Sequence, residues 1–186
     1  MAFSVNEFAG ALKNGGARSG LFQVEMTVPT DIGIPNTDGV MEQMRLTAHA
    51  ASIPSSTIEP TDITYFGRTL RIPGSRTFED WTTTVYIDES YKVRDFFEEW
   101  SEAIIGQESN TSKIDLGLGA EYTKDIEVAL FSKAGNEIRK YKLIQAWPTT
   151  IGATDLAWEG NDIQTFEVTW AYTHWETPSF STRFGG

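Results

Sequence analysis

The segment DIQTFEVTWAYTHWE, residues 162–176, decides the fold class because it alternates apolar and polar residues over most of its length. Such alternation sends neighbouring side chains to opposite faces of a β-strand. One predicted face is apolar and must turn away from water; it consists of Phe166, Val168, Trp170 and Tyr172. The other is small, polar and mildly acidic; it consists of Thr165, Glu167, Thr169, Ala171 and Thr173. The sequence therefore predicts one long strand from Ile163 to Trp175.

The residues before this strand, WPTTIG at 147–152 and an acidic stretch at 155–162, predict a Trp-Pro corner and then a loop. Residue patterns predict further strands at 21–28, 44–51 (the weakest), 63–72, 77–87, 122–130 and 137–146. Turn residues predict a loop at 29–39, a bulge or hairpin turn at Gly67, a turn at Pro73-Gly74 and a hairpin turn at 133–136. We expect a mainly β chain with a sandwich or barrel-like architecture.

One main helix is predicted at residues 88–106, with Asp88 as its cap and Gly106 at its end. Its apolar residues recur at helical spacing and are Val93, Phe96, Phe97, Trp100 and Ile104. We expect this stripe to pack on the sheet. The residues predicted to form the core and to dock the helix are Trp81, Val85, Phe97, Trp100, Ile104, Phe166, Val168 and Trp170.

A short helix or arm is predicted in residues 1–18, because Ser4 and Glu7 have the spacing of a capping box. The length of 186 residues fits one domain, residues 1–186. No Cys is present, which excludes a disulfide scaffold and a thiol nucleophile. The formal charge of −11 disfavours a protein that grips nucleic acid. Neither a secretory signal nor a membrane span is recognisable, so we expect synthesis and folding in the cytosol and no stable membrane insertion.

Catalytic, cofactor and metal sites are not predicted. His49 and His174 have no nucleophile or ligand partner nearby in sequence, and Glu79-Asp80 are strand neighbours that point to opposite faces. Gly117-Leu118-Gly119 lacks the context of a phosphate loop. The acidic stretch 155–162 does not have the spacing of an EF-hand, which favours a polar hairpin connection over a calcium site.

The six Trp residues keep a carbohydrate-binding β-sandwich open as a distant alternative. Trp81, Trp100 and Trp170, however, lie on predicted apolar faces, as core or subunit-interface residues do. The sequence pattern does not assign Trp147, Trp158 and Trp175 to the core or to the surface.

Three blocks of the chain resemble the tail tube proteins of contractile-tailed bacteriophages, in particular those of the T-even type. They are residues 21–25, residues 76–85 with the helix after them, and residues 147–176, and their order and spacing match as well. The loop at 29–40 looks longer than in that pattern, and residues 177–186 extend past its usual end. The tube proteins of pyocins, extracellular injection systems and type VI secretion are similar in fold, so a non-phage contractile injection system is the nearest alternative.

The resemblance implies a structural protein without enzymatic activity. Six copies would form a ring with a continuous inner β-barrel, and rings would stack on a baseplate inside a contractile sheath. The implied partners are further copies of the chain, the sheath, baseplate and tail terminator proteins, and a tape measure protein or DNA in the lumen. The implied location is the tail of a virion assembled in the host cytoplasm.

Two sets of residues are candidates for contacts in such a tube. Short polar side chains without Lys or Arg would let DNA pass without adhering. The lumen candidates are Asp80, Thr82, Thr84, Thr165, Glu167, Thr169 and Ala171. Loops longer than about 12 residues are usually functional or disordered, so the long polar loops are expected to make the stacking contacts. The stacking candidates are Asp31, Ile34, Asn36, Asp38, Ser55, Thr57 and Glu59.

Overall fold

The computed structural model describes residues 5–12, 16–29, 32–35, 37–112, 114 and 121–177. One strand, β7 (Glu137–Ile151), belongs to both halves of its main sheet. Its first part pairs antiparallel with β6 (Lys124–Phe131), and its last part pairs with β8 (Thr165–Ala171). The strand order is β1-β6-β7-β8-β5-β2, and β9 (His174–Glu176) also pairs with β7. The remaining strands are β1 (Phe22–Met26), β2 (Ala48–Ala51) and β5 (Trp81–Tyr86). The predicted mainly β class is confirmed.

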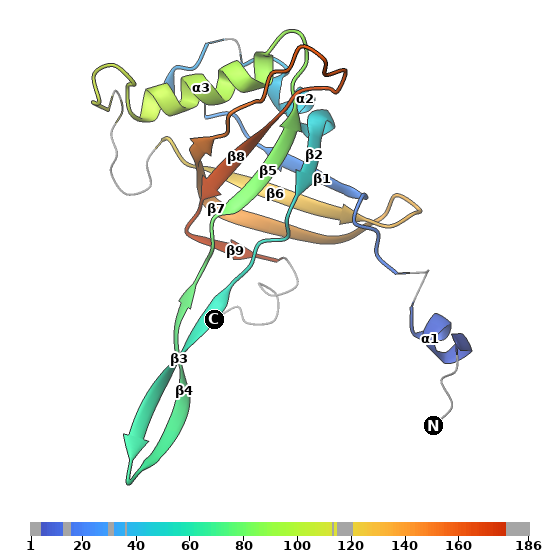
Figure 1. Ribbon diagram of the computed structural model, residues 1–186, viewed down its shortest axis with the longest axis vertical. Coiled ribbons are helices and arrows are strands. Elements are labelled where there is room, and N and C mark those ends of the chain that lie inside the picture. Colours follow the sequence, from blue (N-terminus) through green and yellow to red (C-terminus); the bar gives the residue numbers. More distant parts are fainter. Residues whose placement is uncertain are drawn as a thin grey trace.

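The long helix α3 (Lys92–Ile104) lies across one end of the β5–β8 part of the sheet (Figure 1). All five residues of the predicted apolar stripe are buried on its inner side. Phe97 is central, because its ring centroid lies 5.5 Å from that of Trp170 and 6.0 Å from that of Phe166. Trp100 contacts Trp170 at 5.8 Å and donates its indole N–H to the Tyr122 carbonyl. The aromatic cluster thus fixes the helix on the sheet.

Each predicted core residue is buried. Val93, Phe96 and Ile104 pack beside the aromatic cluster, and Ile126, Val128 and Leu143 extend the core under β6 and β7. Apolar burial on this scale is the main free-energy source for the fold, at roughly 1.5–3 kcal/mol per large side chain. The core therefore lies between α3 and both halves of the sheet.

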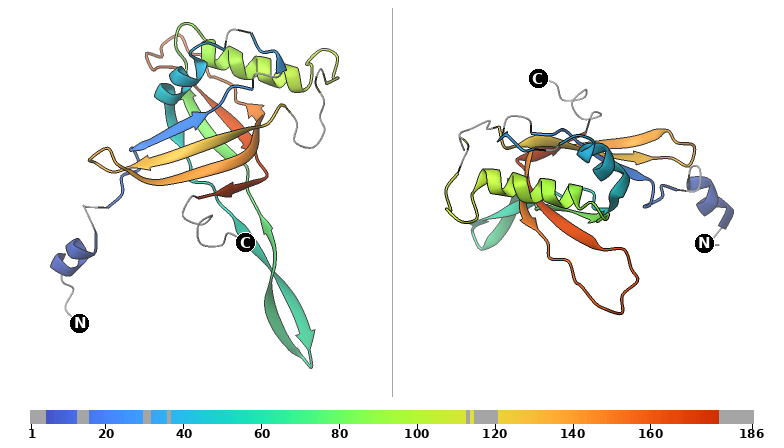
Figure 2. Two further views of the ribbon diagram at one scale, coloured as in Figure 1. Left: turned by 180° about the vertical axis from the view of Figure 1, so that it is seen from behind. Right: turned by 90° about the horizontal axis from the view of Figure 1, so that it is seen from above.

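A long hairpin, β3 (Thr57–Tyr65) and β4 (Arg68–Thr77), extends away from the body at the end opposite α3 (Figures 1 and 2). Its turn is Phe66-Gly67, with positive φ at both residues, as a two-residue hairpin turn requires. The predicted hairpin turn at Gly67 is confirmed. The predicted turn at Pro73-Gly74 is wrong: both residues lie within β4, where Pro73 faces Pro60 beside an irregularity in the register. An isolated ladder accepts proline at such a position, because no third strand needs its missing N–H.

The weak strand predicted at 44–51 is wrong over its first half. Residues Val40–Thr47 form helix α2, and only Ala48–Ala51 form a strand, β2. Val40 and Met44 are both buried, which is the four-residue spacing of one helix face. The predicted loop therefore ends at Gly39, whose φ of 72° leads into the helix. A third helix, α1 (Val5–Ala11), lies within the predicted N-terminal arm and apart from the body (Figure 1).

The predicted Trp-Pro corner and the single final strand are also wrong. β7 continues through Trp147 and Pro148, and its direction changes earlier, at Gln145, whose φ is 56°. The final strand breaks after Ala171, because the Thr173 N–H bonds to the Ile144 carbonyl at 3.0 Å and the chain then pairs with β7 as β9. Backbone pairing with a bulged neighbouring strand determines both the course of β7 and the break in the final strand. The alternation of side chains alone does not show such pairing.

The strand predicted at 77–87 and the start of the helix need correction as well. β4 ends at Thr77 and β5 begins at Trp81, so Asp80 lies outside the strands. Asp88 does not cap α3: it accepts the Ser90 hydroxyl at 2.6 Å and its carbonyl binds the Tyr91 N–H, which forms a turn before the helix. The hairpin turn predicted at 133–136 is confirmed between β6 and β7.

Candidate assembly surfaces

The face of β5 and β8 that points away from α3 is polar. Cross-strand register places Thr82 opposite Thr169 and Thr84 opposite Glu167, with Thr165 opposite Tyr86. These side chains are half-buried or exposed, while those between them are buried beneath the helix. Residues directly opposite one another share one face of an antiparallel pair. The fold therefore brings most of the predicted lumen candidates together.

This polar face continues onto the neighbouring strands. Thr150 of β7 pairs with Thr169, and Ala50 of β2 pairs with Thr84. The Gly152 N–H donates to the Glu167 carbonyl at 2.7 Å and extends the ladder by one residue. β2, β5, β8 and residues 145–151 of β7 contain no Lys or Arg. We refer to the face formed by Thr82, Thr84, Thr150, Thr165, Glu167 and Thr169 as the polar face.

Two further lumen candidates lie at the margin of this face or outside it. Ala171 pairs with Trp147 at the end of β8 and is half-buried. Asp80 is exposed in the link between β4 and β5 and is not part of the ladder. Burial raises the pKa of Tyr172, and the charges of Asp80 and Glu79 raise it further. The strand predicted at 77–87 is thus interrupted at Asp80, and a place for this residue in the lumen stays a prediction.

The stacking candidates divide into four groups. Thr57 and Glu59 are exposed on β3, at the base of the hairpin. Ser55 and Asp38 are exposed too, but their carbonyls accept hydrogen bonds from Trp175 Nε1 and Lys92 Nζ. Ile34 is partly buried against the core, so only part of its side chain is open to a contact. Asp31 and Asn36 lie outside the described residues.

The hairpin has one apolar face, which was not predicted from the sequence. Ile63 pairs with Leu70, and their next neighbours on the same face are Tyr65 and Ile72. All four are exposed, and Phe66 at the tip is 88% exposed. The alternation of residues 63–72 could have predicted this face. Only the structure shows that this face stays exposed, with none of the described residues covering it (Figures 1 and 2).

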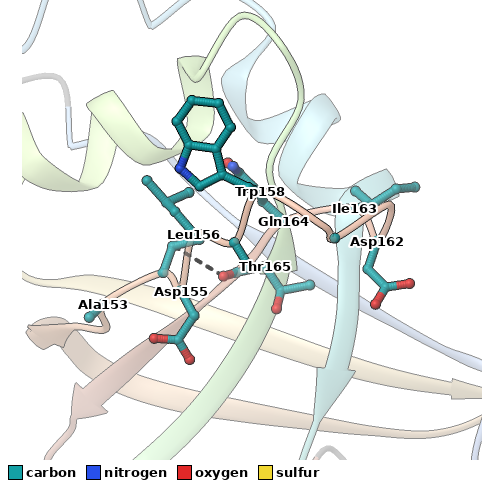
Figure 3. Close-up of a pocket in the computed structure, with 11 residues that line it drawn as sticks. Ala153, Asp155, Leu156, Trp158, Asp162, Ile163, Gln164 and Thr165 are labelled. Carbon is teal, nitrogen blue, oxygen red and sulfur yellow. Dashed lines mark hydrogen bonds between the residues drawn. The ribbon is translucent and has the colours of Figure 1, made fainter.

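A second exposed apolar surface lies in the connection between β7 and β8, residues 152–164, which we call the β7–β8 loop. Leu156, Trp158 and Ile163 line a hollow of about 600 Å³ on this loop, and Trp158 is fully exposed (Figure 3). The sequence predicted a polar connection here. Acidic residues lie among these apolar ones, which follow no regular period, so no pattern marked them.

Hydrogen bonds fix the base of the β7–β8 loop. Arg94 of α3 donates to the Gly152 carbonyl at 3.3 Å and to Thr154 Oγ1 at 2.9 Å. Thr154 Oγ1 donates to the Thr165 carbonyl at 3.1 Å. The guanidinium of Arg94 also lies over the Phe166 ring at 5.5 Å. The loop is therefore anchored to the helix while its apolar side chains face solvent.

The described residues contain no group of three or more His, Cys, Asp or Glu residues placed to hold a metal ion. His49 packs on the Tyr86 ring, and His174 contacts Glu176 at 3.2 Å. Neither histidine has a nucleophile beside it among these contacts. In the part of the chain that the structure describes, no helix is long and apolar enough to cross a membrane.

Known proteins share both the sequence and the fold. The phage tail tube protein family model matches residues 17–178. Tail tube protein gp19 of Enterobacteria phage T4 is 33% identical over 162 residues, which cover 86% of this chain and 91% of that protein. The tail tube protein of Serratia phage KSP90 is 27% identical over 165 residues, 87% of this chain and 89% of that protein.

Two solved structures of contractile particles contain chains with this fold. A chain of the anti-feeding prophage baseplate has a TM-score of 0.63 at 15% identity and covers 87% of this chain and 94% of its own length. A chain of the extended sheath–tube complex of an extracellular contractile injection system, PVC, has a TM-score of 0.58 at 17% identity and covers 95% and 98%. These likenesses show a shared fold.

The mainly β fold and these matches define a structural protein of the tube-forming class. The chain belongs to the phage tail tube protein family. The predicted resemblance and the predicted function, a structural protomer of a contractile tail's tube, are thereby confirmed.

Proposed function

We propose that six copies of this chain close into a ring, and that the rings stack into a hollow tube inside a contractile sheath. In this assembly the chain is purely structural and catalyses no reaction. Residues 1–186 act as one tail tube domain. The protein is made and assembled in the host cytoplasm before it becomes part of the virion tail.

The single observation that carries the proposal is the polar face. One side of β5 and β8 is buried beneath α3, and the other side is open and polar, with no Lys or Arg on β2, β5, β8 or residues 145–151 of β7. A wall of this kind suits a lumen, because DNA phosphates find no cation to hold them and bases find few aromatic rings to stack on. Thr82, Thr84, Thr165, Glu167, Thr169 and Ala171 line the channel, and Glu167 contributes a negative ring.

The edges of the sheet support closure into a ring. Within the described residues, β1 and β2 each pair with a neighbouring strand on one side only. Unpaired strand edges invite further strands, and a closed barrel removes them. Heterologous contacts between identical copies produce such a ring when the rotation closes. The inner β-barrel of the tube therefore forms from the polar faces of neighbouring protomers.

The partners follow from this arrangement. The sheath surrounds the outer surface, the baseplate and tail terminator bind the two ends of the tube, and DNA or a tape measure protein occupies the lumen. Stacking between rings uses the exposed hairpin, including Thr57 and Glu59, with residues at 31–38 and Ser55 as further contacts. The chain inserts into no membrane stably.

A non-phage contractile injection system is the second candidate. Its support is the fold shared with the anti-feeding prophage and PVC chains. The phage reading has the stronger support, because the relatives at 33% identity are phage tail tube proteins. Particles that carry DNA in their tails would favour the phage, and particles that carry only protein cargo would favour the injection system.

Electron microscopy of the purified, concentrated protein tests the proposal. We expect hexameric rings or hollow tubes. A protein that stays strictly monomeric and binds a sugar in a saturable manner would overturn the proposal and support the carbohydrate-binding alternative.

A further inference from the structure

We propose that the tip of the β3–β4 hairpin of one copy docks on the β7–β8 loop of the next copy along the tube. This inference rests on the proposed stacking of rings and specifies the two surfaces that meet. The occupant of the hollow on the β7–β8 loop is thus a second copy of this chain.

The hairpin needs a partner for a thermodynamic reason. A two-stranded hairpin is marginally stable in water by itself, and this one extends from the body with every residue of both strands exposed. Its apolar face presents Ile63 and Leu70 as a cross-strand pair, and Tyr65 is 73% exposed beside the tip. Covering such a face removes apolar surface from water, at roughly 25 cal/mol per Å².

The β7–β8 loop also exposes apolar surface. Leu156 is 76% exposed and Ile163 is 68% exposed, on either side of the exposed Trp158. Contiguous exposed apolar groups with a polar rim mark interaction sites. Because Arg94 fixes the base of the loop, the hollow is formed before any partner arrives, and docking does not have to order the loop first.

Charge selects the pairing. The hairpin carries Arg68, Arg71 and Arg76 against Glu59 and Asp62, which makes it net positive in a chain of net charge −11. Asp62 already neutralises Arg71 at 3.2 Å. Arg68, beside the tip, makes no ion pair within the described residues, so it is the cation that a docking partner would meet.

The β7–β8 loop supplies the opposite charge. It contains Asp155, Glu159 and Asp162 and no basic residue. An apolar, basic tip and an apolar, acidic hollow are complementary, and complementary charge steers docking and fixes its register.

The two surfaces lie at opposite ends of the molecule. The β7–β8 loop is at the end that carries α3, and the hairpin tip is the farthest point at the other end (Figures 1 and 2). Within one chain they cannot meet. Between copies they make a head-to-tail contact that repeats along an axis, which is the geometry of an open stack.

Cross-linking tests this contact, and the chain suits it because it has no cysteine. The double variant Phe66→Cys with Trp158→Cys is assembled into tubes and treated with a short bismaleimide reagent. We expect a ladder of trimers and larger products, because each copy is linked to the copy before it and the copy after it. Each single variant should give no ladder. The matched control pairs Phe66→Cys with Ile138→Cys, since Ile138 is also an exposed apolar residue but lies at the start of β7, just after the hairpin turn.

Tubes that form but give no ladder, or that give an equal ladder with the control pair, would overturn the docking and leave the tube function intact. A wild-type protein that forms neither rings nor tubes would instead count against the proposed function. If replacement of Trp158 prevents tube formation, the second pair Tyr65→Cys with Glu159→Cys decides the question by the same ladder, because Glu159 is an exposed neighbour in the same loop.

Discussion

The indole Nε1 of Trp170 donates a hydrogen bond of 3.0 Å to Thr83 Oγ1 inside the apolar core. Trp170 is fully buried and Thr83 is 1% exposed, so water cannot replace either partner. Thr83 lies on β5 beside Val168, on the side of the sheet that α3 covers. The hydrogen bond to the Trp170 indole therefore explains why a polar residue occupies this inward position.

Thr83→Val should lower the free energy of unfolding by about 1–3 kcal/mol, because the Trp170 N–H stays buried without an acceptor. Chemical denaturation measures the change. The control is Thr82→Val, whose side chain is on the open face and whose effect should stay within about 0.5 kcal/mol. Equal stability of Thr83→Val and the wild type would show that the hydrogen bond does not matter to the core.

Trp100→Ala should cost about 3–5 kcal/mol, because Trp100 is completely buried against Trp170 and Phe97. Thermal unfolding measures it, with Asp95→Ala as the exposed control on the same helix. An unchanged melting temperature would remove Trp100 from the contacts that dock α3.

Asp125→Asn should weaken the fold at neutral pH but not at low pH. Burial raises the pKa of Asp125, yet the hydrogen bond from Lys142, the Gln145 N–H and the Lys142 charge outweigh it, so the pKa falls below 3.8. A depressed folded pKa stabilises the protein above the unfolded pKa, and this contribution is lost as pH falls through the folded value.

The difference in stability between wild type and Asp125→Asn should therefore be largest above about pH 5. It should shrink as the pH drops below the ordinary pKa of an aspartate. Denaturation midpoints at several pH values measure it. Lys142→Met should reproduce the loss of pH dependence. A difference that is constant with pH would rule out the ion pair as its source.

Glu167→Lys should allow tubes to assemble but slow DNA delivery, most strongly at low salt, because six cations in the lumen would hold phosphates. Particle infectivity and DNA release measure this effect. Glu89→Lys, the same charge change at an exposed position before α3, is the control. Normal delivery combined with failed sheath assembly would place the polar face on the outside of the tube.

Gly74→Ala should impair stacking without weakening the body. A Cβ at Gly74 would lie 2.6 Å from the Glu59 carbonyl oxygen and 2.7 Å from Thr61 Oγ1, so the two strands of the hairpin would have to separate. Because the hairpin packs away from the core, unfolding of the body should change by less than about 0.5 kcal/mol. Electron microscopy should show rings but few tubes, whereas Ser75→Ala should form tubes normally. Normal tubes from Gly74→Ala would show that stacking tolerates a distorted hairpin.

Local pattern predicted the parts of this fold whose burial follows a simple period. The stripe on α3 and the alternation of β8 are of this kind, and the core residues on both elements are buried as expected. Helix α2 was not predicted, because its two buried residues, Val40 and Met44, form an apolar stripe too short to distinguish from a strand pattern. The predicted strand ends were wrong near Asp80 and Thr173, because strand pairing stops at the first position and redirects the chain at the second.

The assembly surfaces show the same division. Alternation predicted which side chains of β5 and β8 share the polar face, since the register of an antiparallel pair preserves it. It did not predict the exposed apolar groups of the β7–β8 loop, because a loop has no period. It also could not show that the apolar side of the hairpin stays uncovered.

The sequence by itself determined the mainly β class, the apolar stripe of the long helix, the inward and outward faces of β5 and β8, and the family. Each of these is encoded by residues close together in the chain or by a family pattern that runs along it. Only the tertiary structure decided that β7 serves both halves of the sheet, that Gln145 redirects it, and that the hairpin and the β7–β8 loop lie at opposite ends. Those features depend on backbone hydrogen bonds and packing between distant segments, and a linear pattern contains no record of which segments meet.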